Sequence, residues 1–379
     1  MNEAFLMFLG ICLQSVVVIV TLLTCFAYMT WWERRTVAWM QWRVGPNRVG
    51  WQGLLQPLAD GGKLLFKEQL QPRDARPFLF GLAPCISLVV ALSAYAVIPV
   101  HSGPITIPFL NYTIYPSIAD PGIGVLYLLG ISSLGVYGII LGGWSSNNKY
   151  AMIGAIRSSA QVISYELALG TALISPLLLI GSLSFREIVG YQAQGPFWGE
   201  GGWLVFAQPL AFVLYCIAAV AEVNRAPFDL PEAEQELGAG YHTEYSGMKF
   251  AMFFMAEYVN MITVSSVAAT VFLGGPNSPI PGLIPGGIWW FALKVASFMF
   301  CFIWLRATFP RFRYDQLMRI GWQMLLPLGL LNLGVSAVGV VLGWKSYQFL
   351  LAVCGMVLML VMLSVLNRPQ PRPEAQAHH

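Results

Sequence analysis

The sequence predicts an all-α membrane protein, a polytopic helix bundle, and three observations lead to this fold class. Of the 379 residues, 57% are hydrophobic. Only 10% are charged, whereas soluble domains average about 25%. Runs without charge that are long enough to cross a hydrocarbon core of about 30 Å recur along the chain. A water-soluble domain is therefore excluded, and we treat residues 1–379 as a single integral membrane domain.

The apolar runs predict about nine transmembrane helices, each needing roughly 20 residues. They lie at 5–31, 78–100, 122–144, 160–181, 203–222, 250–273, 287–307, 321–343 and 346–366. The first run starts with Met1-Asn2-Glu3 and has no basic segment before it. We therefore expect a retained membrane helix and not a cleaved signal peptide.

Lysine and arginine gather in alternate connections between the spans. Of the 21 such residues, 18 lie in 32–76, 145–158, 223–249, 306–320 and the tail 367–379. Cytoplasmic loops carry the excess of Lys and Arg, so we expect the N-terminus outside and the C-terminus in the cytoplasm. The net charge of +3 follows from this topology, and nothing else in the sequence indicates binding to nucleic acid.

Cysteine and histidine do not form the clusters that metal centres need. The six cysteines all fall inside predicted spans, and none belongs to a Cys-x-x-Cys pair. No two of the four histidines share a span at a spacing that would hold a haem. Iron–sulfur and zinc sites need clustered thiolates, so we expect no metal site, no redox centre and no cofactor on this chain.

The first cytoplasmic segment, 32–76, contains an amphipathic helical pattern. Apolar and polar residues fall on opposite sides of it: Trp51, Leu54, Leu58 and Leu65 against Gln52, Gln56, Asp60, Lys63 and Lys67. This spacing is typical of a helix lying in the membrane interface. The helix is either a surface anchor or, as we favour, also shapes a portal for a lipid-soluble ligand.

Three carboxylates are predicted inside or at the ends of membrane spans: Glu166, Glu222 and Glu257. Each costs roughly 2.5 to 3.5 kcal/mol at a helix centre unless it is paired or hydrated. Such groups usually mark proton or ion paths. The alternative is static pairing with a cation such as Arg157 or Lys294.

The connection 223–249 is acidic on a side of the membrane that is otherwise basic. It carries Asp229, Glu232, Glu234, Glu236 and Glu244 against Arg225 and Lys249. Two prolines, with Phe228 and Leu230 between or beside them, favour an ordered segment. A solvated acidic loop is the alternative; we favour an ordered acidic path.

Several strings together resemble one protein family. They are Trp32-Glu33-Arg34-Arg35, Gly45-Pro46-Asn47-Arg48-Val49-Gly50, Leu55-Gln56-Pro57-Leu58-Ala59-Asp60, the segment 222–236, Gly240-Tyr241-His242-Thr243-Glu244-Tyr245 and Arg311-Phe312-Arg313-Tyr314-Asp315-Gln316-Leu317. In order, from about residue 25 to about 330, the chain resembles the quinone-chamber membrane subunit of proton-pumping NADH:quinone oxidoreductase, respiratory complex I.

The resemblance implies a division of labour in a bacterial inner-membrane complex. NADH, FMN and iron–sulfur clusters would bind partner subunits of a hydrophilic arm. This chain would complete a chamber for quinone, either ubiquinone or menaquinone, beside small and antiporter-like membrane subunits and lipid. The implied quinone-binding residues are Arg34, Arg43, Asp60, Lys63 and Arg306. The implied proton path comprises Glu166, Glu222, Asp229, Glu232, Glu234, Glu236 and Glu257. Arg225 would pair with carboxylates of the acidic loop, and Arg157 would have a similar structural role.

Other classes of protein share some of these features. A secondary ion transporter also uses intramembrane charges, but it should show paired halves with broken helices, which the sequence lacks. A membrane subunit of a hydrogenase, formate or ferredoxin-linked complex shares the architecture without needing the portal. A purely structural anchor leaves the buried carboxylates unexplained. One departure from the family is Ser133, where some relatives have a glutamate.

Overall fold

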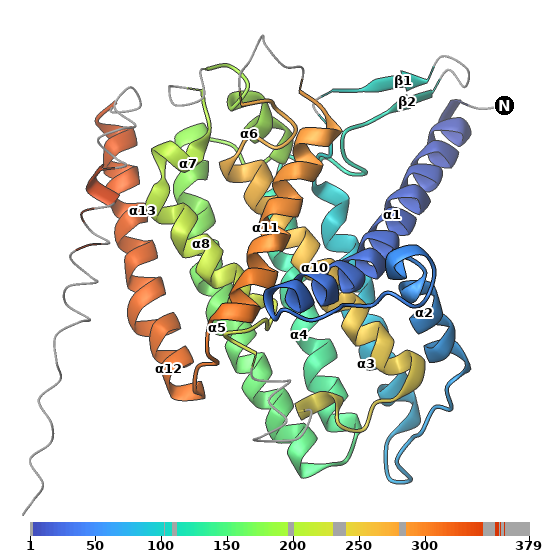
Figure 1. The fold of residues 1–379 in the computed structure, drawn as a ribbon. Helices are drawn as coiled ribbons and strands as arrows, with labels where there is room; N and C mark the ends of the chain where they lie inside the picture. Colours follow the sequence, from blue (N-terminus) through green and yellow to red (C-terminus); the bar gives the residue numbers. More distant parts are fainter. Residues whose placement is uncertain are drawn as a thin grey trace, which may run out of the picture.

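The computed structural model describes residues 3–101, 103–107, 112–195, 201–229, 240–279, 286–343, 353–355, 357 and 360. These residues form a bundle of long helices (Figure 1). Seven helical runs within them are long and apolar enough to cross a membrane. They are α1 (Glu3–Met40), α3 (Pro77–Ala94, continued by η2, Tyr95–Val97), α4 (Gly124–Ser145), α5 (Lys149–Ile180), α10 (Gly247–Phe272), α11 (Ile288–Thr308) and the run of α12 (Tyr314–Arg319), η4 (Ile320–Leu325) and α13 (Leu326–Val341). The predicted all-α membrane bundle is confirmed.

The fifth predicted span is a shorter helix than the others. It consists of α7 (Leu204–Ala207) and α8 (Pro209–Glu222), separated by Gln208. The break has a local cause, because Pro209 has no backbone N–H and begins a new helix at its first position. Most of the ninth predicted span, 346–366, and all of the tail 367–379 lie outside the described residues.

The first helix is longer than predicted, and this corrects the boundary of the segment 32–76. α1 continues to Met40 instead of ending at residue 31. The charged residues after Trp32 are good helix formers, and the stretch from Trp32 to Gly45 contains no other glycine and no proline. Hydropathy indicates where the apolar environment ends, and the helix itself continues beyond that point. Glu33, Arg34 and Arg35 therefore lie on the last turns of a helix.

The predicted interfacial helix is present as α2 (Gln56–Phe66), which follows η1 (Trp51–Gly53). Pro57 lies in its first turn and Lys63 in its last, both favourable positions in a helix. α2 lies against α1 and α10 (Figure 1). None of its residues is buried, as expected of a helix on the edge of a bundle.

At the opposite end of the bundle is a short hairpin that the sequence did not predict. Strand β1 (Ile105–Ile107) pairs antiparallel with β2 (Tyr112–Ile114), and Ile105 faces Ile114. The helix α6 (Phe185–Tyr191) lies at the same end (Figure 1). The hairpin, α6 and the start of α11 thus cover the end away from α2 and α12.

The centre of the bundle is built on α4, α5, α8 and α10. α4 packs against α3 and α5, α5 against α8 and α13, and α10 against α3 and α11. α10 is the most enclosed of the long spans, since 67% of the residues in its most apolar stretch are buried, against 11% for α1. Close contact between α4 and α5 needs a glycine: a Cβ on Gly143 would lie 2.3 Å from the Cβ of Ala155.

Candidate functional site

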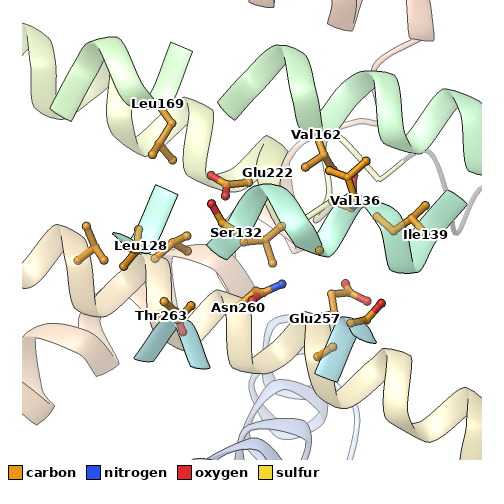
Figure 2. A pocket seen from close by; sticks show the side chains of 18 of the residues that line it. Leu128, Ser132, Val136, Ile139, Val162, Leu169, Glu222, Glu257, Asn260 and Thr263 are labelled. Carbon is orange, nitrogen blue, oxygen red and sulfur yellow. The ribbon is translucent and has the colours of Figure 1, made fainter. Parts of the chain in front are cut away.

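A cavity lies inside the bundle between α4, α8 and α10, and two carboxylates line it. Glu222 reaches it from the end of α8 and Glu257 from α10, with Ser132 of α4 and Asn260 of α10. In Figure 2, Glu222 and Ser132 approach each other, while Asn260 and Glu257 extend from α10 into the same space. The cavity offers about 90 Å³ to the centres of water molecules, and about 10–15 Å³ on this measure holds one water. It is thus large enough, and polar enough, for several.

A third intramembrane carboxylate lies beside this cavity. Glu166 is on α5, and the hydroxyl of Ser133 on α4 forms a short hydrogen bond with its Oε1. Ser133 thus contacts a carboxylate inside the bundle. Glu222 has one carboxyl oxygen, Oε2, that is buried without a hydrogen-bond partner among the described residues. Water in the cavity would satisfy it.

Glu257 is also part of a buried cluster of charges. Arg225 Nε lies 2.9 Å from Glu257 Oε1, and Arg225 Nη1 lies 3.7 Å from Glu33 Oε1. Glu33 in turn forms an ion pair with Arg306 of α11. The hydroxyl of Tyr258 donates to Glu33 Oε2 at 2.6 Å, and its ring lies 4.2 Å from the Arg225 guanidinium carbon. α1, α10, α11 and the residues after α8 therefore meet at one network.

The first part of the acidic connection is ordered and buried. Asp229 is 4% exposed and accepts a hydrogen bond from Arg311 at 3.1 Å. Gln161 of α5 donates to the carbonyls of Phe228 and Ala221, at 2.9 and 2.8 Å. Phe312 N donates to the carbonyl of Pro227. These contacts join the acidic connection to α5, α8 and the segment before α12.

The described contacts of Arg225 are with helix carboxylates, and its expected pairing with carboxylates of the acidic connection stays a prediction. Arg225 pairs with Glu257 and Glu33 on two helices, and Asp229 pairs with Arg311. Arg225 lies three residues after the end of α8, within reach of both helix carboxylates. Glu232, Glu234 and Glu236 lie outside the described residues.

The predicted quinone-binding residues fall into two groups. Arg34 of α1 donates to Asp60 Oδ2 of α2 at 2.7 Å, and Gln56 Nε2 donates to the other oxygen, Oδ1, at 3.0 Å. Lys63 lies one turn further along α2, and Arg43 bonds to the side chain of Gln41. The second group is Arg306 alone, on α11 at the Glu33 cluster. Arg34 and Glu33 are adjacent on α1 and connect the two groups.

The two proposed cation partners of the intramembrane carboxylates make other contacts. The Arg157 guanidinium lies over the ring of Tyr314 at 5.2 Å. Lys294 donates to three backbone carbonyls. Within the described residues, no group of three His, Cys, Asp or Glu side chains is arranged to hold a metal ion.

His242 and Tyr245 lie in the last part of the acidic connection, between two membrane spans. The His242 ring lies 3.8 Å from that of Tyr241 and 5.3 Å from that of Phe253. Burial lowers the pKa of His242 to about 3 and raises the pKa of Tyr245 to about 12. Both side chains are therefore neutral at cellular pH, and they anchor the end of the acidic connection against α3 and α10.

Several residues of the site were not predicted from the sequence. Glu33 was grouped with the arginines that follow it, which are common at membrane boundaries. Its signal was a carboxylate between Trp32 and Arg34 on a helix. Asn260 and Ser132 are uncharged, and no local pattern marks them as lining a cavity.

Comparison with known proteins identifies the family. Residues 13–337 match the family described as NADH dehydrogenase. The chain belongs to this family. The H subunit of NADH-quinone oxidoreductase from Thermomicrobium roseum is 53% identical over 86% of this chain and 94% of its own length. The corresponding protein of Protochlamydia amoebophila is 52% identical over 83% and 92%. NADH-quinone oxidoreductase subunit 8 of Thermus thermophilus is 48% identical over 95% of each.

These matches confirm the resemblance to this membrane subunit of NADH-quinone oxidoreductase. As a member of the family, the chain is a multi-pass membrane subunit of an enzyme complex. The family match over residues 13–337 spans the cavity, the Glu33 cluster and α2. Membership also disfavours the secondary-transporter alternative.

Proposed function

We propose that this chain forms the membrane side of a quinone-binding chamber and couples quinone reduction to proton translocation. Its relatives are named as subunits of NADH-quinone oxidoreductases. In the proposal, partner subunits of a hydrophilic arm hold NADH, FMN and iron–sulfur clusters, and quinone is the substrate. The complex lies in a bacterial inner membrane, with the N-terminus of this chain outside and its C-terminus in the cytoplasm, beside small and antiporter-like membrane subunits.

The observation that carries the proposal is the cavity shared by Glu222 and Glu257. Two carboxylates facing one hydratable space inside a membrane bundle cost folding free energy, and such residues usually have a function. Waters bridging polar groups across such a space provide hydrogen-bonded steps for a proton. Ser132 and Asn260 supply further hydrogen-bonding groups along the wall. Glu166 extends the series beyond the cavity through Ser133.

The buried charge cluster supports a link between this cavity and the quinone chamber. Arg306 has a half-exposed side chain, with 37% of its surface accessible. From it the contacts run to Glu33, then to Arg225, and then to Glu257, which lines the cavity. Unit charges about 4 Å apart interact by about 4 kcal/mol at an effective dielectric constant of about 20. A charge change next to Arg306 would therefore alter the proton affinity of Glu257 through Glu33 and Arg225.

The interfacial helix supports the portal. Trp51, Leu58, Leu65 and Phe66 expose most of their apolar surface, as suits a helix immersed in the membrane boundary. The Arg34 to Asp60 pair holds α2 against α1 next to Glu33. In the proposal, a quinone dissolved in the bilayer passes α2 on its way to the chamber.

Two glutamine substitutions test the proton path. Glu222→Gln and Glu257→Gln keep the side-chain shape and remove the titratable group, so each should lower quinone reduction and proton pumping together. Glu187→Gln is the matched control, because Glu187 is an exposed residue of α6 far from the cavity. Full activity and full pumping in Glu222→Gln, with the complex assembled, would contradict the proposal.

Photo-labelling tests the chamber. An azido-quinone added to membranes should label peptides within 32–67 or 223–249, and excess quinone should prevent this. Labelling restricted to other subunits of a quinone-active complex would contradict the assignment and favour a hydrogenase-like role.

A further inference from the structure

Lys294 is a buried cation near the end of the bundle that lies opposite the basic connections. It lies on α11 and is 7% exposed. Its Nζ donates to the carbonyls of Leu273, Gly275 and Asn277 at 2.6, 2.8 and 2.7 Å. Three donated hydrogen bonds correspond to the three N–H groups of an ammonium, since a neutral amine has only two. The ring of Trp203 covers it at 4.5 Å, a cation–π distance.

The three carbonyls belong to the C-terminal end of α10 and the turn after it. The last carbonyls of a helix have no partner within the helix and usually bind water or a cap. Here Gln192 donates to Thr270 O and Val271 O, both at 3.0 Å. Lys294 binds three carbonyls that come after these two in the chain. Side chains thus occupy positions that water would take at this helix end.

A line of buried hydroxyls leads from the cavity to this end of α10. Thr263 lines the cavity, and Ser266 and Thr270 follow at spacings of three and four residues, which places them on one helix face. Ser266 and Thr270 are fully buried. Each of the three hydroxyls donates to a backbone carbonyl four residues earlier, and Ser266 also forms a hydrogen bond with the buried Tyr95 hydroxyl. Thr263 and Thr270 are about 10 Å apart along the axis, at about 1.5 Å per residue.

Lys294 lies at the end of this line of hydroxyls, near the last turn of α10. We propose that Lys294 is a cationic barrier that stops protons in the Glu222 and Glu257 cavity from crossing the remaining part of the bundle along α10. A fixed positive charge in a low-dielectric site repels a proton entering beside it, and channels exclude protons by the same means. The cavity then exchanges protons on one side only. This inference rests on the proposed proton-carrying role of the cavity.

The test is passive proton conductance of the whole complex in liposomes, without NADH, under an imposed potassium diffusion potential. Lys294→Gln keeps donors and similar bulk but removes the charge. It should speed the proton flux driven by this potential by about tenfold, a barrier decrease of about 1.4 kcal/mol. Lys294→Arg retains the charge and should remain tight. Lys294→Met provides a second neutral variant should the glutamine prevent assembly, with the same expected leak.

Gln192→Leu is the control for a structural effect, because it removes hydrogen bonds at the same helix end without changing charge. A leak in Gln192→Leu equal to that in Lys294→Gln would overturn the electrostatic barrier, as would wild-type tightness in the neutral Lys294 variants. The double variant Lys294→Gln with Glu222→Gln separates the two proposals. Loss of the leak in it supports both. A persisting leak means that the route bypasses Glu222, which contradicts the proton path and leaves the barrier supported.

Discussion

Arg225 forms an ion pair with Glu257, with 2.9 Å between Nε and Oε1, and both side chains are mostly buried. Removing one partner of such a pair leaves an uncompensated charge and typically costs about 3–5 kcal/mol. Arg225→Gln is therefore expected to reduce the amount of assembled complex sharply. The measurement is the band of intact complex on a native gel.

The matched variant is Arg225→Gln with Glu257→Gln. It removes opposite charges together, so it should recover part of the assembly that Arg225→Gln loses, although Glu33 still lacks its second arginine. Wild-type assembly of the single Arg225 variant would contradict the buried pairing.

Two glycines of α4 should respond differently to the same change. A Cβ on Gly143 would meet the Ala155 Cβ at 2.3 Å and the Ala151 carbonyl oxygen at 2.7 Å, while a Cβ on Gly130 would meet nothing within 4 Å. Gly143→Ala should destabilise the α4–α5 contact by about 1–3 kcal/mol. Gly130→Ala should be neutral or slightly stabilising, because alanine favours helix. Thermal denaturation of the purified complex compares them, and equal effects would contradict the close approach.

The Arg34 to Asp60 pair should matter for quinone access more than for stability. The side chains are 55% and 34% exposed, and such exposed pairs contribute little to folding. Asp60→Asn should therefore leave the complex assembled and raise KM for quinone, because α2 loses its tie to α1. Arg73→Gln, an exposed change in the same connection, is the control. An unchanged KM in Asp60→Asn would argue against α2 as the portal.

His242 should make stability depend on pH. Burial lowers its folded-state pKa from 6.5 to about 3, so the unfolded chain binds this proton more readily. The stabilising effect of the neutral ring is complete above about pH 6.5 and is lost as pH falls toward 3, by up to about 1.4 kcal/mol per pH unit.

His242→Phe keeps an aromatic ring and removes the titration. The difference in melting temperature between the wild type and His242→Phe should grow from pH 7 to pH 5, in favour of the variant at acid pH. A difference that does not vary with pH would contradict the burial of a neutral imidazole. Other acidic groups titrate in both proteins, so the difference isolates His242.

Local properties of the sequence determined the class of the protein and the approximate positions of the spans that lie within the described residues. Three features need no knowledge of tertiary contacts. They are the apolar runs, the helical period of 56–66 and the excess of Lys and Arg on alternate connections. The same applies to Glu166, Glu222 and Glu257, since a carboxylate within an apolar run stands out without knowledge of its neighbours. The end of α1 was missed because hydropathy changes before the helix ends.

Only the tertiary structure decided which of these groups meet. Glu33 contacts Arg306 and Tyr258, which are far away in the chain, and Arg225 pairs with carboxylates of α1 and α10. Ser132 and Asn260 became part of the site because α4 and α10 turn those faces toward one cavity. Charge pairing in a bundle depends on how each helix is rotated and how deeply it lies. Those quantities are set by packing between helices, and no single segment of the sequence contains them.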